Sequence, residues 1–294
     1  MIEHDELAER FEAQRGLLQA VAYRMLGSRS EAEDAVQETW LRLGRTDAGS
    51  VDNLTGWLRT VVTRICLDML RSRTSRREEL TEHQVLDQVS EPARGSRPED
   101  EAVLADSVSR ALLVVLDTLE PAERVAFVLH DMFAVPFDRI APIVERTPAT
   151  TKKLASRARR KVRGTPVIPA EELTRHREVI SAFLSAARAG DLTGILAVLA
   201  PDVVRRCDPA ALAPGMAAEV RGARAVAEGT VHFARRSQAA ELALVDGAVG
   251  VVVAPHGQLL FALTFTIEED RIAAYEVIAG PARLRRLSLA VLAG

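Results

Sequence analysis

The sequence has few cysteines, no long apolar run and no excess of positive charge, and each shortage excludes a class of protein. Cys66 and Cys207 lie far apart in a chain of 294 residues, so their spacing fits neither a disulfide framework nor a zinc site. The longest apolar runs, such as 111–116 and 248–254, are far shorter than the roughly 18 residues that span a bilayer. The first ten residues are acidic and lack the basic start and apolar core of a signal peptide. We expect a soluble, cytoplasmic protein with no membrane partner.

The overall charge argues against a chain that binds nucleic acid by bulk positive charge. There are 38 lysines and arginines against 41 aspartates and glutamates, a formal net charge of −3. Apolar residues make up 48% of the chain, which is enough for packed cores. The length suggests two or three domains.

The pattern of the sequence changes three times along the chain. Helical periodicity over residues 5–72 is followed by an acidic stretch with three Pro or Gly residues at 80–106, which is typical of a linker. Helices are predicted again over about 103–163, and Ser30 with Glu33 forms a capping-box pattern in the first helical part. A second joint, 164–169, closes the helical region.

From about residue 170 the pattern predicts helices first and then strands. Helices are expected at 173–188, 192–199 and 222–236, with Gly190-Asp191 ending the first and capping the second. Strand-like runs follow at 239–245, 248–254, 259–267 and 271–279, and Asp246-Gly247 predicts a hairpin between the first two. Helices followed by an antiparallel meander indicate an α+β domain.

Residues 136–163 carry the most specific chemical signal. Two short amphipathic helices are predicted, the second beginning at Thr147-Pro148, where an N-cap precedes a proline. Residues 146–163 contain eight basic residues, no acidic residue and all three lysines of the chain. This pattern is typical of a helix-turn-helix whose second helix enters the major groove, rather than of an ordinary solvated basic helix.

The helical half resembles regions 2 and 4 of the sigma-70 family, and within it the extracytoplasmic-function sigma factors. The resemblance lies in EAEDAVQETWLRL (31–43), in 53–78 and in the block from LEPAERVAFVLHDMF to residue 162, and it covers roughly residues 8–163. It implies a promoter-recognition subunit that binds DNA together with RNA polymerase. That would explain how a chain without bulk positive charge can serve a DNA function. A basic region is nevertheless present, since residues 107–163 carry eleven basic and six acidic residues.

The resemblance implies three groups of contact residues. One helix face would bind the β′ clamp helices of the polymerase core: Asp34, Gln37, Glu38, Trp40 and Leu41. This face could equally be solvated surface, and Trp40 could instead belong to the hydrophobic core. A loop and the helix after it would bind the −10 promoter element, whose melting needs a base pocket and cations: Asp52, Asn53, Arg59, Arg64, Arg71 and Arg73. The basic helix would read the −35 element: Thr150, Thr151, Lys152, Lys153, Ser156, Arg157 and Arg160.

Two features near the predicted helix-turn-helix need separate interpretation. Pro142 lies where relatives carry a good helix former, and it should bend or shorten the first helix. His130-Asp131 could suggest catalysis, but we interpret the pair as part of the supporting helix.

Residues from about 172 to 290 resemble SnoaL-like domains, the α+β cone shared with nuclear transport factor relatives. In some sigma factors such an extension is thought to regulate activity in cis. This chain lacks the tryptophan-proline linker motif and the DGGGK-like loop, and its NPDKL-like end reads AGPARLRRL. The fold also hosts enzymes, for which Asp208, His232, His256 and Tyr275 are candidates that are more readily explained as structural. The interior of a cone can hold a small ligand, and Cys207 could be a redox handle.

The sequence therefore predicts a multidomain protein, two all-α sigma domains followed by an α+β SnoaL-like cone. The expected parts are region 2 at 1–79, an acidic linker at 80–106, region 4 at 107–164, a linker at 165–171 and a regulatory domain at 172–294. Expected partners are the polymerase core, through β′ and the β subunit, promoter DNA and an unknown small ligand. We expect no catalytic residue, metal or cofactor. Two alternatives remain, a stand-alone ligand-sensing transcription regulator and a SnoaL-like enzyme fused to a DNA-binding module.

Overall fold

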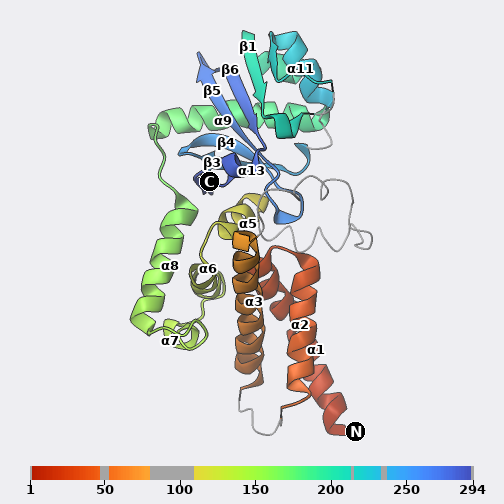
Figure 1. Cartoon of the computed structure of the whole chain (residues 1–294), viewed down its shortest axis with the longest axis vertical. Helices are drawn as coiled ribbons and strands as arrows, with labels where there is room; N and C mark the ends of the chain where they lie inside the picture. The colour runs from red at the N-terminus through yellow and green to blue at the C-terminus, as the bar shows by residue number, and fades with distance from the viewer. Residues whose placement is uncertain (1, 47–52, 80–108, 213–214, 233–236, 293–294) are drawn as a thin grey trace. The chain divides into compact units, whose positions relative to one another are not determined.

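The computed structural model describes residues 2–46, 53–79, 109–212, 215–232 and 237–292 (Figure 1). They form two compact units. Unit 1 contains the described residues 2–46 and 53–79 together with Leu116–Arg159. Ser109–Val115 belong to the second unit, together with Arg160 and the residues after it. The five-part division predicted from the sequence stays a prediction.

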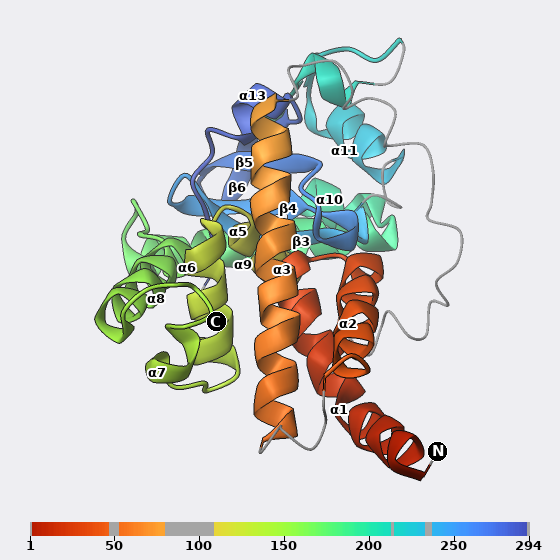
Figure 2. The same cartoon turned by 60° about the horizontal axis from the view of Figure 1, so that its bottom comes forward.

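Three long helices form the first part of unit 1. Figures 1 and 2 show α1 (Ile2–Leu26), α2 (Arg29–Leu43) and α3 (Leu54–Glu79) side by side. Their apolar residues recur at helical spacing, and the side chains on the inner faces are almost fully buried, among them Phe11, Leu18, Val36, Leu43 and Leu58. This hydrophobic stripe fixes which face of each helix remains available to a partner.

α2 begins two residues earlier than predicted. Ser28, rather than Ser30, is the N-cap, and its hydroxyl accepts a hydrogen bond from the backbone N–H of Glu31. Gly27 precedes it with φ of 73°, a left-handed conformation that glycine adopts without strain. Because the helix begins two residues earlier, Ser30 already lies within it.

The second part of unit 1 contains short helical elements. The boundary between the two units falls within α5 (Arg110–Asp117), between Val115 and Leu116. After α5 the chain forms α6 (Pro121–Phe127), a π-helical turn η3 (Val128–Met132), α7 (Phe137–Ile140) and α8 (Pro148–Arg163). The predicted helix-turn-helix is present as α7, a turn and α8.

Pro142 shortens the first helix of this motif, as predicted. α7 has four residues, and Ala141–Glu145 continue as turns. Proline has no N–H to donate to a carbonyl one turn back, so the helix ends before it. Arg146 N–H instead bonds the carbonyl oxygen of Ala141 at 3.0 Å, and Glu145 adopts a φ of 56°.

Unit 2 contains the α+β domain. Its helices are α9 (Ala170–Ala189), α10 (Leu192–Val198) and α11 (Ala223–His232). Gly190 ends α9 in the left-handed conformation with φ of 68°, as the glycine-aspartate pair predicted. Asp191 occupies the N-cap position of α10, although its side chain makes no capping hydrogen bond.

Seven strands form one sheet in the order β2-β1-β6-β5-β4-β3-β7. The strands are β1 (Leu199–Cys207), β2 (Glu219–Arg221), β3 (Ala240–Val245), β4 (Ala248–Val253), β5 (Phe261–Glu268), β6 (Arg271–Ile278) and β7 (Leu289–Ala290). α9 lies across this sheet (Figure 1) and packs Phe183 and Leu184 into its core. The short helices η4 (Pro209–Ala211), η5 (Pro255–Gly257) and α13 (Pro281–Leu284) lie in the connections.

The four predicted strands and the hairpin are confirmed. Asp246 and Gly247 have φ of 51° and 80°, the two positive values that a type I′ turn needs. The predicted antiparallel meander is confirmed as well, because β3, β4, β5 and β6 pair antiparallel in chain order. Outside the meander, β1 pairs parallel to β6 with Arg205 opposite Tyr275. The predicted order of all-α domains followed by an α+β domain is confirmed.

No helix among the described residues is long and apolar enough to cross a membrane. The same residues contain no cluster of three or more His, Cys, Asp and Glu side chains that could hold a metal ion.

Candidate functional site

The outward face of α2 combines polar groups with one exposed leucine. Asp34 and Gln37 are exposed, and Glu38 forms an ion pair with Arg42 one turn along, with 2.9 Å between Oε1 and Nε. Leu41 lies on the same face, since residues three and four apart are neighbours on a helix surface. We call Asp34, Gln37, Glu38 and Leu41 the α2 face.

Leu41 is the unusual member of this face. Its side chain is 53% exposed, and apart from Val167 no other large apolar side chain among the described residues is comparably exposed. A single exposed leucine is common on monomeric proteins and does not by itself mark a binding surface. Its place in the middle of a polar helix face is compatible with an apolar anchor and a polar rim. Trp40 behaves differently, because its ring packs against Phe11 with centroids 4.9 Å apart. The core interpretation of Trp40 therefore accounts for part of its surface.

The residues of the predicted −10 group that the structure describes lie on α3 and directly before it. Asn53 is exposed and caps the helix, its Oδ1 accepting the backbone N–H of Gly56 at 2.9 Å. Arg64 is exposed, and Arg59 is half-buried with its Nε out of reach of any hydrogen-bond acceptor in the described residues. Asp52 lies outside the described residues.

The two remaining arginines of that group are bound within unit 1. Arg73 forms an ion pair with Glu31, and its Nη1 donates to the carbonyl oxygen of Leu26 at 2.9 Å. Arg71 is exposed and lies 3.8 Å from both Asp68 and Glu145. Arg73 thus ties α3 to the junction of α1 and α2, while Arg71 keeps a solvent-facing guanidinium.

α8 presents a basic face and an apolar face. Thr147 caps the helix, since its Oγ1 accepts the backbone N–H of Thr150 at 3.2 Å, and Pro148 occupies the first helical position. The predicted −35 residues that lie on the exposed face are Lys152, Lys153, Ser156, Arg157 and Arg160. Thr150 is half-buried.

Thr151 lies on the opposite face of α8. Its side chain is fully buried, and its hydroxyl donates to the carbonyl oxygen of Thr147 at 3.0 Å. It follows Thr150 by one residue, or about 100° around the helix, which turns it toward Leu154 and Ala155. Its place in the predicted −35 group is not consistent with this burial.

Ion pairs fix α8 on the elements before it. Arg157 pairs with the buried Glu123 of α6 at 3.2 Å, and Arg159 pairs with Asp131 of η3 at 2.6 Å. His130 stacks on Phe137 with ring centroids 3.8 Å apart. His130 and Asp131 therefore support the helix-turn-helix, as predicted.

Arg124 is a buried cation of unit 1 that the sequence did not single out. Only 2% of its surface is exposed, and its Nη1 lies 3.2 Å from Oδ1 of Asp117. Nη2 donates to the carbonyl oxygen of Arg24 at 3.5 Å. Burial lowers the pKa of Arg124 to about 10, although the carboxylate of Asp117 acts in the opposite direction and raises it. Burial also raises the pKa of the nearby Cys66 thiol to about 12, so this cysteine stays protonated.

In unit 2, Asp208 has a structural role. Its Oδ2 accepts the backbone N–H groups of Ala279 and Gly280 at 3.0 Å each, and Arg283 forms an ion pair with it. Burial disfavours the charged form, but these hydrogen bonds prevail and the pKa of Asp208 is lowered. Asp208 is not among the residues that line the cavity described next.

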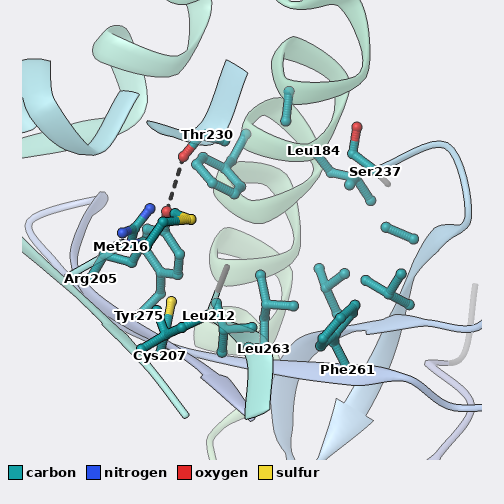
Figure 3. Close-up of a pocket in the computed structure, with 17 residues that line it drawn as sticks. Leu184, Arg205, Cys207, Leu212, Met216, Thr230, Ser237, Phe261, Leu263 and Tyr275 are labelled. Carbon is teal, nitrogen blue, oxygen red and sulfur yellow. Dashed lines mark hydrogen bonds between the residues drawn. The ribbon is translucent and has the colours of Figure 1, made fainter. Parts of the chain in front are cut away.

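A cavity of about 120 Å³ lies between the sheet and its helices (Figure 3). Its walls are mainly apolar, and most of the polar exceptions gather near Tyr275, whose hydroxyl lies 2.9 Å from that of Thr230. Ser237 is the exception that lies away from Tyr275, beside Leu184. Burial raises the pKa of Tyr275 to about 12. Of the enzyme candidates, Tyr275 lines this cavity, whereas the side chains of His232 and His256 lie outside the described residues.

Arg205 also lines the cavity, and the sequence analysis missed it. Its exposed fraction is 4%, while the next residue, Arg206, is exposed and pairs with Glu219 at 3.0 Å. Adjacent residues of a strand point to opposite faces, so one arginine of such a pair must point inward. That signal required β1 to be predicted as a strand, which the sequence analysis did not do.

Comparison with known proteins supports the interpretation of unit 1. The family model described as sigma-70 region 2 matches residues 10–76, and the model of sigma-70 region 4 matches residues 109–162. The ECF RNA polymerase sigma factor SigJ of Mycobacterium tuberculosis is 39% identical over 250 residues, which cover 83% of this chain and 80% of that protein. The probable ECF RNA polymerase sigma factor SigI of the same species is 38% identical over 208 residues, which cover 71% and 72%.

One solved structure covers nearly the whole chain. The crystal structure of Mycobacterium tuberculosis SigJ aligns at 32% identity with a TM-score of 0.47, over 94% of this chain and 98% of that one. The chain contains two sigma-70 regions in the expected order, and it covers more than two thirds of the length of relatives that are 38–39% identical to it. These findings establish the family. The chain belongs to the extracytoplasmic-function sigma factors of RNA polymerase.

Proposed function

We propose that this protein directs core RNA polymerase to specific promoters and starts transcription there. The observation that carries the proposal is α8, whose basic face is exposed while its apolar face and two ion pairs fix it on α6 and η3. A rigid basic helix after a short turn is suited to the major groove. We assign it to the −35 element through Thr150, Lys152, Lys153, Ser156, Arg157 and Arg160.

The α2 face is proposed to bind the β′ clamp helices of the core, with Leu41 as its apolar anchor and a further contact to the β subunit elsewhere. Support comes from the exposure of Leu41 within a polar surround. The start of α3 is proposed to hold the melted −10 element, with Asn53, Arg59, Arg64 and Arg71 as contacts. We leave Arg73 out of this surface, because it is half-buried and its guanidinium is bound both to Glu31 and to the carbonyl oxygen of Leu26. Arg157 also forms an ion pair, but its side chain is exposed.

We further propose that the α+β domain modulates this activity in cis. Glu241 of β3 accepts the backbone N–H of Ala111 at 2.9 Å, and its other oxygen lies 3.6 Å from Arg110. A carboxylate here stabilises the first turn of α5, where unpaired N–H groups and the helix dipole favour an anion. Residues 109–162 match region 4, so this contact supports a coupling between the domain and the start of the promoter-reading segment.

Leu41→Lys tests the docking surface in run-off transcription with purified core polymerase and promoter DNA. We expect core affinity to fall at least tenfold, about 1.4 kcal/mol, because burying a charge in place of an anchor removes a hot spot. Val167→Lys is the matched control, since Val167 is 71% exposed and receives the same change outside the α2 face. Tight promoter binding without core, and no core-dependent transcript from the unmodified protein, would disprove the sigma proposal.

The −35 assignment is tested by the salt dependence of promoter binding by the holoenzyme. Lys152→Ala should reduce the slope of log K against log salt by about 1, as expected for the loss of one phosphate contact. Arg224→Ala removes a cation from α11 instead, and its slope should equal that of the unmodified protein. Equal slopes for both variants would remove Lys152 from the DNA surface.

Modulation in cis is tested by Glu241→Ala, with Glu219→Ala as the control, because Glu219 is a carboxylate of the same sheet that contacts only Arg206 and Arg221 in the described residues. We expect Glu241→Ala alone to change the yield of run-off transcript at equal protein concentration. Identical yields from both variants would contradict the coupling.

A further inference from the structure

The guanidinium of Arg205 is a buried cation with no partner. It makes no hydrogen bond or ion pair with the residues that the structure describes, and its Nε is completely shielded from solvent. Arginine stays protonated in proteins, and an isolated buried charge is strongly unfavourable unless something neutralises it. The structure therefore keeps a costly group in a position where no described residue neutralises it.

Three carboxylates lie near Arg205 along the same strands or directly after them, and none of them pairs with it in the described residues. Asp202, three residues before Arg205 on β1, is exposed. Asp208, three residues beyond Arg205, is held by Arg283 and two backbone N–H groups. Glu276 of β6 is also paired with Arg283, at 2.8 Å. Among the positions between 209 and 236 that the structure leaves undescribed, the sequence has no aspartate or glutamate.

The cavity around Arg205 has a polar end and an apolar end. Figure 3 shows Arg205, Cys207 and Met216 grouped near Tyr275, with Leu184 and Phe261 toward the other end. The hydroxyl proton of Thr230 is donated to the carbonyl oxygen of Val226 at 2.8 Å, so Tyr275 donates its proton to Thr230. Both hydroxyl protons are then in use, and the guanidinium remains as a donor for a guest.

We propose that the cavity binds a small monocarboxylate, with the carboxylate on Arg205 and an apolar body directed toward Leu184 and Phe261. A guanidinium matches a planar carboxylate with two parallel hydrogen bonds. One cation neutralises one negative charge, which suits a monoanion better than a phosphate dianion that would need further donors. The cavity, at about 120 Å³, is of the same order as the cavity of about 150 Å³ that binds benzene, which limits the guest to roughly one small ring or a short alkyl chain.

The first test uses the full-length protein and three probes of one shape. Benzoate, benzamide and benzylamine share a ring and differ in charge, and each is titrated by calorimetry and by thermal shift. We expect benzoate to bind at least tenfold more tightly than benzamide, and benzylamine not to bind. Binding of benzamide as tight as that of benzoate, or no binding of benzoate or hexanoate up to about 10 mM, overturns the proposal.

The second test compares two adjacent arginines. Arg205→Met removes the buried cation and keeps an apolar side chain, whereas Arg206→Met removes the exposed arginine that pairs with Glu219. We expect benzoate affinity to fall at least tenfold in the first variant and to stay within twofold in the second. Equal affinities in both overturn the proposal, and if Arg205→Met fails to fold, the probe comparison on the unmodified protein still decides. This binding is independent of promoter activity, so either proposal can fail without the other.

Discussion

Arg124 and Arg205 are the arginines buried among the described residues, one in each compact unit, and they differ in what neutralises them. Arg124, 2% exposed, faces the carboxylate of Asp117 and a backbone carbonyl oxygen. Arg205, 4% exposed, faces a cavity and has neither. A buried cation that a carboxylate neutralises helps to stabilise the folded state. A buried cation without such a partner lowers the stability, and its presence is explained if a bound anion supplies the missing charge.

The largest expected effect follows from removing the partner of the paired arginine. Asp117→Ala leaves Arg124 buried without its carboxylate, and we expect a loss of about 3 kcal/mol in the free energy of unfolding. Urea denaturation followed by circular dichroism measures it, with Asp138→Ala, an exposed carboxylate of α7, as the control within about 0.5 kcal/mol. A loss no larger than that of the control would remove the distinction between the two arginines.

Asp208→Asn probes a carboxylate that follows Arg205 by three residues but is engaged by another arginine, Arg283. Losing its charge-assisted bonds to Arg283 and to the backbone should cost about 2 kcal/mol at neutral pH. Because the folded pKa of Asp208 is lowered, its contribution is complete above its unfolded pKa of about 3.9 and is lost as the pH falls through the folded pKa. The difference between the two proteins should therefore shrink below about pH 4 in denaturation curves. A difference that does not depend on pH would contradict a role for its charge.

Arg205→Met should have the opposite sign to Asp117→Ala. Without ligand, replacing an unpartnered buried cation by an apolar side chain should stabilise the protein by about 1 kcal/mol. Thermal denaturation in a buffer without carboxylates measures this, and Arg206→Met serves as the control. A lower melting temperature for Arg205→Met would show that the guanidinium supports the fold as Arg124 does.

Gly229→Ala should have the smallest effect on stability and a selective effect on binding. A Cβ at this position of α11 would lie 2.9 Å from Nη1 of Arg205, so the guanidinium must move. Alanine in a helix stabilises it by about 0.5–1 kcal/mol relative to glycine, while the displaced cation should bind benzoate severalfold more weakly. Calorimetry separates the effect on stability from the effect on benzoate binding. Gly16→Ala in α1 is the control, because a Cβ at that position meets nothing within 4 Å. Unchanged benzoate affinity would place the carboxylate elsewhere in the cavity.

Local signals in the sequence predicted much of this fold. Thr147-Pro148 and Asp246-Gly247 each determine the backbone within a few residues, so the start of α8 and the β3–β4 hairpin could be predicted without tertiary information. Pro142 acts in the same way, because a missing N–H ends a helix whatever surrounds it.

The errors occur where distant residues decide. β1 contains Pro201, Asp202 and two arginines, which disguise it as an irregular stretch, and it becomes a strand by pairing with β2 and β6. Arg205 was missed for that reason. Thr151 was assigned to DNA from its type and position, but a shift of one residue on a helix decides between solvent and core.

The pairing of β1 with β6 joins two strands that are synthesised at different times. Arg205 leaves the ribosome seventy residues before Tyr275, the residue opposite it in the sheet. α8, at 148–163, is synthesised well before either, so the helix that we propose reads the promoter can form while the cavity still lacks a wall. Until β6 emerges, Arg205 remains accessible to water and to any carboxylate in the cell. A nascent chain can thus acquire its DNA-binding helix first and enclose its buried cation last.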